Sequence, residues 1–173
     1  MAIAEYRPAN RLNMLSVILS FSLLFSAFAT PPTTTERAFI SAEIDGLDDY
    51  KATNVNGNYM SFSNSLTLKG STRQYGEDDG RSLTLKVMSF KGQPATFASP
   101  DEVISIEFQG LNSEHDGSRF KLNRDVDAPG KIVVESYADK RISGRFEGHL
   151  INREGQTLHV TNGQFQNVKV MQM

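Results

Sequence analysis

Apolar and polar residues alternate along much of the chain, most regularly between residues 141 and 170. Ile142, Phe146 and Leu150 fall on one side of a two-residue period, and charged, hydroxyl and imidazole residues fall on the other. This alternation predicts a strand with one buried face and one solvated face. The segment that follows repeats the pattern after a polar, glycine-containing stretch at residues 152–156, which is suited to a reversal. The pattern therefore predicts a long antiparallel hairpin.

The register of this hairpin follows from the same alternation. Pairing inward Leu150 with inward Leu158 keeps both strands in phase, whereas a slip of one residue would turn the core residues of one strand to water. His149 then faces His159 on the outer surface, with β-carbons about 4.5–5.5 Å apart.

Shorter runs with strand-like alternation or β-branched content precede the hairpin. They span residues 39–44, 50–55, 65–69, 81–87, 104–108, 119–122 and 131–137. From residue 38 onward, no segment keeps a helical period over about eleven residues or more. About eight to ten strands separated by turns are typical of all-β sandwiches and barrels. We therefore predict an all-β domain built as an antiparallel β-sandwich, with a closed up-and-down β-barrel as the alternative.

The chain begins with the layout of a secretory signal peptide. Arg7 and Arg11 outnumber Glu5 in the charged start, and a nearly uninterrupted apolar run follows over residues 12–29. The run is typical of the helix of a signal peptide, and it ends at Ala29 in an Ala-Phe-Ala sequence of the kind that a signal peptidase reads. We therefore predict cleavage near Ala29.

Cleavage there divides the chain into a signal peptide (1–29), a flexible lead-in (30–37) and a single all-β domain (38–173). The predicted location is then periplasmic or secreted. The alternative is an uncleaved membrane anchor formed by residues 12–29, because a run of about 18 residues lies near the lower limit for a bilayer span. We expect contact with a membrane only in that case.

The net charge and the absence of cysteine argue against several classes of function. The 173 residues carry a formal net charge of -2 and include no cysteine. The absence of a basic excess argues against nucleic acid as a partner, and the absence of cysteine excludes disulfides, thiolate zinc sites and cysteine nucleophiles. Nothing in the sequence calls for a cofactor.

Three motifs near the two ends of the predicted domain carry a resemblance. They are residues 39–46 (Phe-Ile-Ser-Ala-Glu-Ile-Asp-Gly), 142–150 (Ile-Ser-Gly-Arg-Phe-Glu-Gly-His-Leu) and 160–165 (Val-Thr-Asn-Gly-Gln-Phe). With them the chain resembles small exported bacterial β-domains of unknown function, many of which follow a lipoprotein signal. This chain departs from that pattern because it has no cysteine to carry a lipid. The resemblance implies a cell-envelope or secreted location and no established chemistry.

The paired histidines are one candidate metal site. Two imidazoles at cross-strand distance can share a soft divalent ion, and Glu147, two residues along the same face, is the nearby candidate for a third ligand beside His149 and His159. The alternative is an ordinary exposed histidine pair.

Acidic loops are candidate calcium sites, because calcium takes clustered oxygen ligands from loops. Two loops have this composition, and their candidate ligands are Glu77, Asp78 and Asp79 in the first and Asn123, Asp125 and Asp127 in the second. The alternative is a solvated turn in each case.

Tyr59, Tyr75 and Tyr137 lie in or beside turns. Aromatic rings that are exposed on loops are used to capture carbohydrate or peptide, so these three are candidate ligand-binding residues. The alternative is that each ring is half-buried at the rim of the domain.

The sequence contains no motif with an attached catalytic mechanism. It therefore predicts an exported, non-catalytic binding or structural module of the bacterial cell envelope, whose partner is an envelope component, a glycan or a protein. One alternative is a carrier of a small apolar ligand inside a β-barrel, which would need an apolar cavity. A hydrolase is a further alternative, and it would need a histidine beside a serine or an acid in a cleft.

Overall fold

The computed structural model describes residues 37–47, 49–72, 80–110 and 119–173. These belong to one compact unit, Thr35–Met173. The predicted signal-peptide helix and the alternative anchor at residues 12–29 lie outside the described residues. Among the residues that are described, no helix is long and apolar enough to cross a bilayer.

The described part of the chain is all-β, as predicted. Its strands are β1 (Phe39–Ile44), β2 (Tyr50–Ala52), β3 (Asn54–Met60), β4 (Ser65–Ser71), β5 (Ser82–Val87), β6 (Ala95–Ala98), β7 (Ile104–Gln109), β8 (Arg119–Leu122), β9 (Gly130–Ala138), β10 (Arg141–Ile151) and β11 (Thr157–Gln172). A single 3-10 turn, η1 (Ser61–Ser63), connects β3 to β4.

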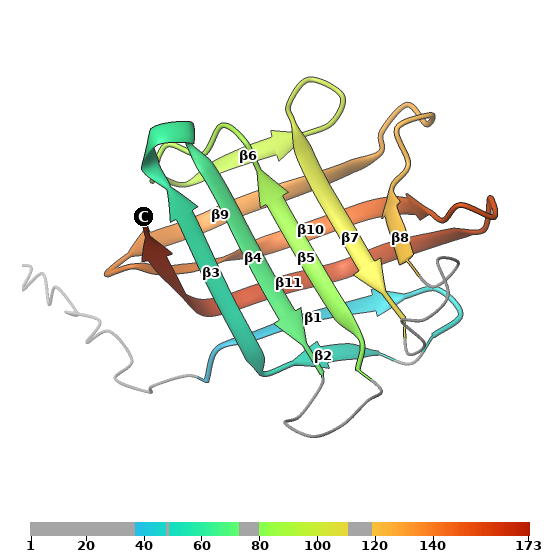
Figure 1. Ribbon diagram of the computed structural model, residues 1–173, viewed down its shortest axis with the longest axis horizontal. Coiled ribbons are helices and arrows are strands. Elements are labelled where there is room, and N and C mark those ends of the chain that lie inside the picture. Colours follow the sequence, from blue (N-terminus) through green and yellow to red (C-terminus); the bar gives the residue numbers. More distant parts are fainter. Residues whose placement is uncertain (1–36, 48, 73–79, 111–118) are drawn as a thin grey trace, which may run out of the picture. The chain divides into compact units, whose positions relative to one another are not determined.

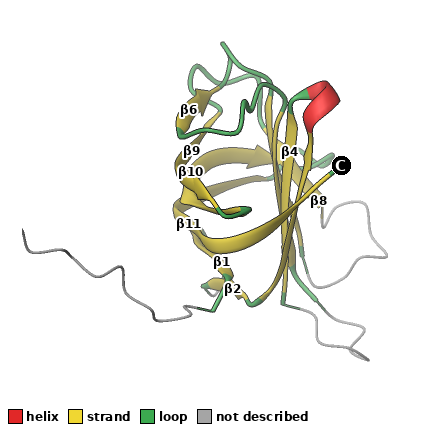
Figure 2. Cartoon of the chain, turned by 90° about the vertical axis from the view of Figure 1, so that its left-hand side faces the viewer, coloured by secondary structure: helices red, strands yellow, loops and turns green. Residues whose placement is uncertain are grey.

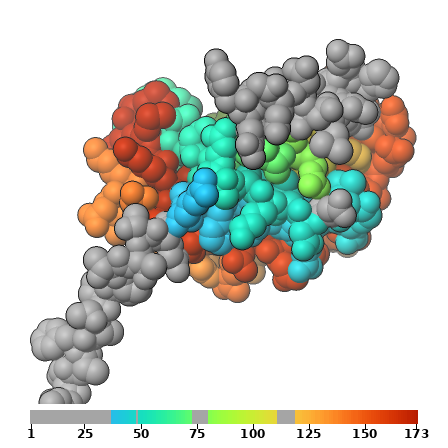
Figure 3. Space-filling view, turned by 90° about the horizontal axis from the view of Figure 1, so that it is seen from below, coloured from blue at the N-terminus to red at the C-terminus, as the bar shows by residue number. Residues whose placement is uncertain are grey.

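The strands form one mixed sheet in the order β2-β1-β11-β3-β4-β5-β7-β8-β10-β9-β6. β10 pairs with β11 in addition, so the pairings that start at β11 and pass through β3, β4, β5, β7, β8 and β10 return to β11. Figures 1 and 2 show two layers whose strands cross, with β3, β4, β5 and β7 in one and β9, β10, β11 and β1 in the other. The first and the last strand of the described chain lie side by side, because β1 pairs with residues 160–166 of β11 (Figure 3).

β11 takes part in both layers. It pairs antiparallel with β1 and β10, and its last residues, Val170 to Gln172, pair parallel with β3. This parallel pair differs from the predicted antiparallel arrangement, and its cause is a change of direction along β11. The β10–β11 register shifts twice, and Asn162 and Asn167 at the two shifts have left-handed backbone, with φ of 49° and 54°. Asparagine adopts this conformation more readily than most residues, and such bulges bend a strand.

Side chains from both layers meet in one hydrophobic cluster. The inward residues predicted for the closing hairpin, Ile142, Phe146 and Leu150, are 0%, 3% and 0% exposed. The ring of Phe146 stacks on Phe165 with centroids 6.5 Å apart. It lies over Gly163, where a β-carbon would come within 2.6 Å of the ring. A glycine is therefore required at this position for the two strands to approach.

Tyr50 places its phenol inside this core, where it is 0% exposed. Burial raises the pKa of Tyr50 above its usual range, because the phenolate would lose its hydration. The nearby Leu83 backbone lowers the pKa of Tyr50 by a smaller amount. The Tyr50 hydroxyl makes no hydrogen bond of good geometry with any described group.

The inward position of Phe146 predicts a large effect on stability. We expect Phe146→Ala to lower the free energy of unfolding by about 3–5 kcal/mol, because it opens a cavity in a packed core. Phe62→Ala is the matched control, because Phe62 is 83% exposed, and it should change stability by no more than about 0.5 kcal/mol. Urea denaturation of both variants measures the difference. A loss below about 1 kcal/mol for Phe146→Ala would contradict the inward placement.

Candidate functional site

The predicted register of the closing hairpin is confirmed. The structure pairs Leu150 with Leu158 and His149 with His159, and the connecting loop runs from Asn152 to Gln156. The two imidazole rings meet edge to face, with centroids 4.3 Å apart. His149 is half-buried and His159 is exposed.

Backbone hydrogen bonds hold the pair from both sides. The His149 N–H donates to the carbonyl of Pro129 (2.8 Å), and the His149 carbonyl accepts from the Asn123 N–H (2.7 Å). On the neighbouring strand, the His159 carbonyl accepts from the Asp45 N–H (3.1 Å). These backbone groups therefore point away from the β10–β11 seam, which makes the histidines a non-hydrogen-bonded pair with closely spaced side chains.

His159 has an acidic neighbour that sequence reasoning missed. Its Nδ1 atom lies 3.5 Å from Oδ2 of Asp45, in the turn that follows β1, and half of the His159 side chain is exposed. Asp45 comes into reach because β1 pairs with β11. That long-range pairing is not readable from the local Asp-Gly turn signal.

A groove of about 370 Å³ runs over the histidine pair. Its lining comes from the end of β6 and from β9, β10 and β11, and consists of Ala98, Ser99, Ala128, Gly130, Lys131, Glu147, Gly148, His149, His159, Val160 and Thr161. Ser99 is the most buried polar residue of the set, at 6% exposure, and its hydroxyl has no hydrogen-bond partner among the described residues.

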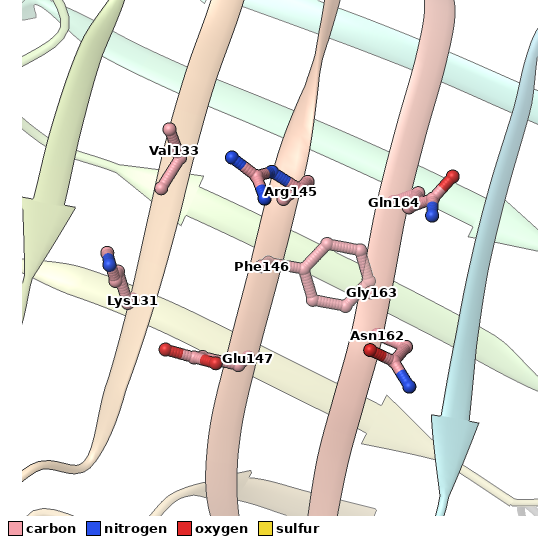
Figure 4. Close-up of a pocket in the computed structure, with 8 residues that line it drawn as sticks. All are labelled: Lys131, Val133, Arg145, Phe146, Glu147, Asn162, Gly163 and Gln164. Carbon is pink, nitrogen blue, oxygen red and sulfur yellow. The ribbon is translucent and has the colours of Figure 1, made fainter.

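A second groove of about 320 Å³ adjoins the first, because Lys131 and Glu147 line both. It adds Val133, Arg145, Phe146, Asn162, Gly163 and Gln164. Figure 4 shows the Phe146 ring reaching from β10 toward Gly163, with polar side chains on the strands around it. Arg145 Nε donates to Glu135 Oε1 at 2.6 Å, and Asn162 Nδ2 donates to Glu43 Oε2 at 2.9 Å. We call the two grooves together the polar face.

Two arrangements needed for catalysis or for metal binding are not seen among the described residues of the polar face. A nucleophilic serine needs a hydrogen bond to its base, and the Ser99 hydroxyl bonds to neither histidine. Glu147 shares the groove with His149 and His159. In the ranges that the structure describes, however, no three His, Cys, Asp or Glu side chains form a group that could hold a metal ion.

Of the two candidate calcium loops, the structure describes only the second. Glu77, Asp78 and Asp79 lie outside the described residues. In the second loop, Asn123 is buried and its Oδ1 accepts a hydrogen bond from the Asp125 N–H at 3.1 Å, whereas Asp125 and Asp127 are exposed. The Asn123 oxygen therefore caps the turn instead of pointing to an ion, as in an Asx-turn.

Of the three candidate tyrosines, the structure describes two. Tyr75 lies outside the described residues. Tyr59 is only 8% exposed, and its ring packs edge-on against Phe90 with centroids 5.3 Å apart. Tyr137 is half-buried against the same ring, at 5.4 Å. The alternation of β3 turns Tyr59 inward, so it is a core residue and not an exposed aromatic on a loop.

Comparison with known proteins adds no relative: no family model, no curated protein and no solved structure matches the chain.

Cysteines introduced at the paired histidines should form a disulfide. The natural chain has none, and a non-hydrogen-bonded cross-strand pair has its Cα atoms about 4.5 Å apart, within the range for a bridge. We expect His149→Cys with His159→Cys to lose both free thiols on oxidation. His149→Cys with Thr157→Cys is the control, because it is offset by two residues along β11. Thiol titration compares them, and bridging in the control alone would reject the register.

Proposed function

We propose that this protein is an exported, non-catalytic binding module whose binding surface is the polar face, and that its ligand is a glycan of the cell envelope. The observation that carries the proposal is the continuity of the two grooves through Lys131 and Glu147. Together they offer an elongated surface, as an extended polymer requires.

The chemistry of the lining supports a glycan. Side chains of both charges stand beside amide, hydroxyl and imidazole groups, for example Arg145, Glu147, Gln164 and Thr161. Such a mixture can donate to and accept from sugar hydroxyls, and it presents no single-sign field for a highly charged polymer. The side chains stand on paired strands, so little backbone conformational entropy is lost on binding.

Large aromatic side chains in the interior argue against the carrier alternative. Phe90, Phe108 and Phe165 are fully buried between the two layers and belong to one cluster with the other inward side chains. For the hydrolase alternative, the described residues show no contact between Ser99 and a histidine of the kind that acyl transfer requires. A binding role on the outer face therefore accounts for more of the observations.

The strand pairings form a closed series, which supports a finer description of the fold. Seven strands follow one another in pairing from β11 back to β11, which favours the closed-barrel alternative over two separate sheets. The barrel we infer is flattened, because its strands lie in two layers (Figure 2) whose inward side chains form one cluster. In such a structure the outer face is the surface that remains for a ligand.

The proposed location is supported by the sequence of the first 29 residues. We propose cleavage near Ala29 and release into the periplasm or outside the cell, with anchoring through residues 12–29 as the alternative. Intact-mass measurement of the protein isolated from cells separates the two, and a mass that retains residues 1–29 would reject cleavage.

Binding can be tested with chitohexaose, a soluble N-acetylglucosamine oligosaccharide, by NMR titration of the purified protein. We expect saturable shifts of backbone amides along β9, β10 and β11. Lys131→Ala should weaken binding about tenfold, because it removes a charged hydrogen-bond donor shared by both grooves. Lys51→Ala, on β2 and outside both grooves, is the matched control and should leave the affinity unchanged. Shifts confined to other strands, or equal effects of the two variants, would contradict the proposal.

A further inference from the structure

The methionines of the described part of the chain gather at one end of the outer face, where β11, β3, β4 and β5 lie next to one another. Met171 and Met173 are 56% and 62% exposed, Met88 is 38% exposed, and Met60 is half-buried. The Met88 sulfur accepts a hydrogen bond from Ser65 Oγ at 3.6 Å, which sets this methionine apart from the other three.

Strand register brings three of these side chains together. β3 and the end of β11 are parallel neighbours, with Met171 opposite Asn58 and Gln172 opposite Tyr59. The Met173 N–H donates to the Tyr59 carbonyl at 2.9 Å, which continues the pairing by one residue. Met173 is therefore beside Met60, and Met171 is two residues back along β11.

The three side chains share a face. Gly57, Tyr59 and Val170 are buried, so the alternate positions, Met60, Met171 and Met173, project to the outside. Neighbouring strands lie about 4.8 Å apart, and residues two apart on a strand about 6.6 Å apart. A methionine side chain has three rotatable bonds, so the three sulfur atoms can reach a common point.

An unpartnered oxygen lies at the same place. Asn58 occupies the outward position between Met60 and Met171, and its Oδ1 is buried without a hydrogen-bond partner among the described residues. A bound cation would offer this oxygen a partner that the neighbouring side chains do not.

Thioether sulfur is a neutral, soft ligand, and soft ligands favour Cu(I) over calcium or magnesium. We propose that Met60, Met171 and Met173 form a binding site for a soft monovalent cation of the Cu(I) class, with Asn58 Oδ1 beside it. The chain uses no cysteine, and thioethers, unlike paired thiols, are not lost to disulfide formation in an oxidising compartment. This site is separate from the polar face and independent of the glycan proposal.

The test is a titration of the purified full-length protein with Cu(I) under anaerobic conditions, with bicinchoninate as the competing ligand. Proton–carbon NMR of the methionine methyl groups reports which side chains take part. We expect the methyl signals of Met60, Met171 and Met173 to shift together and to saturate at one ion per chain, while the signal of Met88 stays in place.

Leucine variants preserve the apolar volume and remove only the sulfur. Met60→Leu, Met171→Leu and Met173→Leu should each lower the affinity by about tenfold or more, because each removes one of three soft ligands. Met88→Leu is the matched control and should have no effect. A double variant, His149→Ala with His159→Ala, should also bind normally. Loss of binding in either control, or no saturable binding by the natural chain, would overturn the proposal.

Discussion

The last strand, β11, has to pair in both layers, and this requirement shapes most of the molecule. Its first thirteen residues are hydrogen-bonded neighbours of β10 and β1, and its last three reach across to β3. A straight strand cannot do this. The two bulges at Asn162 and Asn167 turn the chain, and each places a non-glycine residue in left-handed backbone, which costs about 1–2 kcal/mol. Hydrogen bonds to the neighbouring strands offset that cost: Asn162 donates to Glu43 on β1, and the Asn167 N–H donates to Ser143 Oγ on β10 at 2.9 Å.

The same strand supplies both proposed sites. Its middle section contributes His159, Asn162 and Gln164 to the polar face, and its end contributes Met171 and Met173 to the methionine cluster. Because the bulges bend β11 between these sections, the two surfaces belong to different layers. Ligands at the two sites would therefore approach the domain from different directions.

The hairpin β10–β11 could be predicted in detail from the sequence. Its alternation is strict, and a two-residue period fixes which side chain faces which, so the pairing of His149 with His159 followed directly. Features that depend on distant segments could not be predicted. Asp45 lies near His159, and Ser99 lines the histidine groove, only through the positions of β1 and β6 in the sheet. Tyr59 was expected beside a turn, yet the alternation of side chains along β3 turns it into the core. The parallel β11–β3 pair arises from bulges whose asparagines look like ordinary strand or turn residues in the sequence.

The central claim is that β11 joins the two layers, and nuclear Overhauser contacts in the purified protein test it most directly. The account predicts contacts between Val170–Gln172 and Gly57–Tyr59 in the same spectrum as contacts between His159 and His149. A spectrum with the histidine contacts but none between the end of β11 and β3 would contradict the account, because the two layers would then be joined without the last strand.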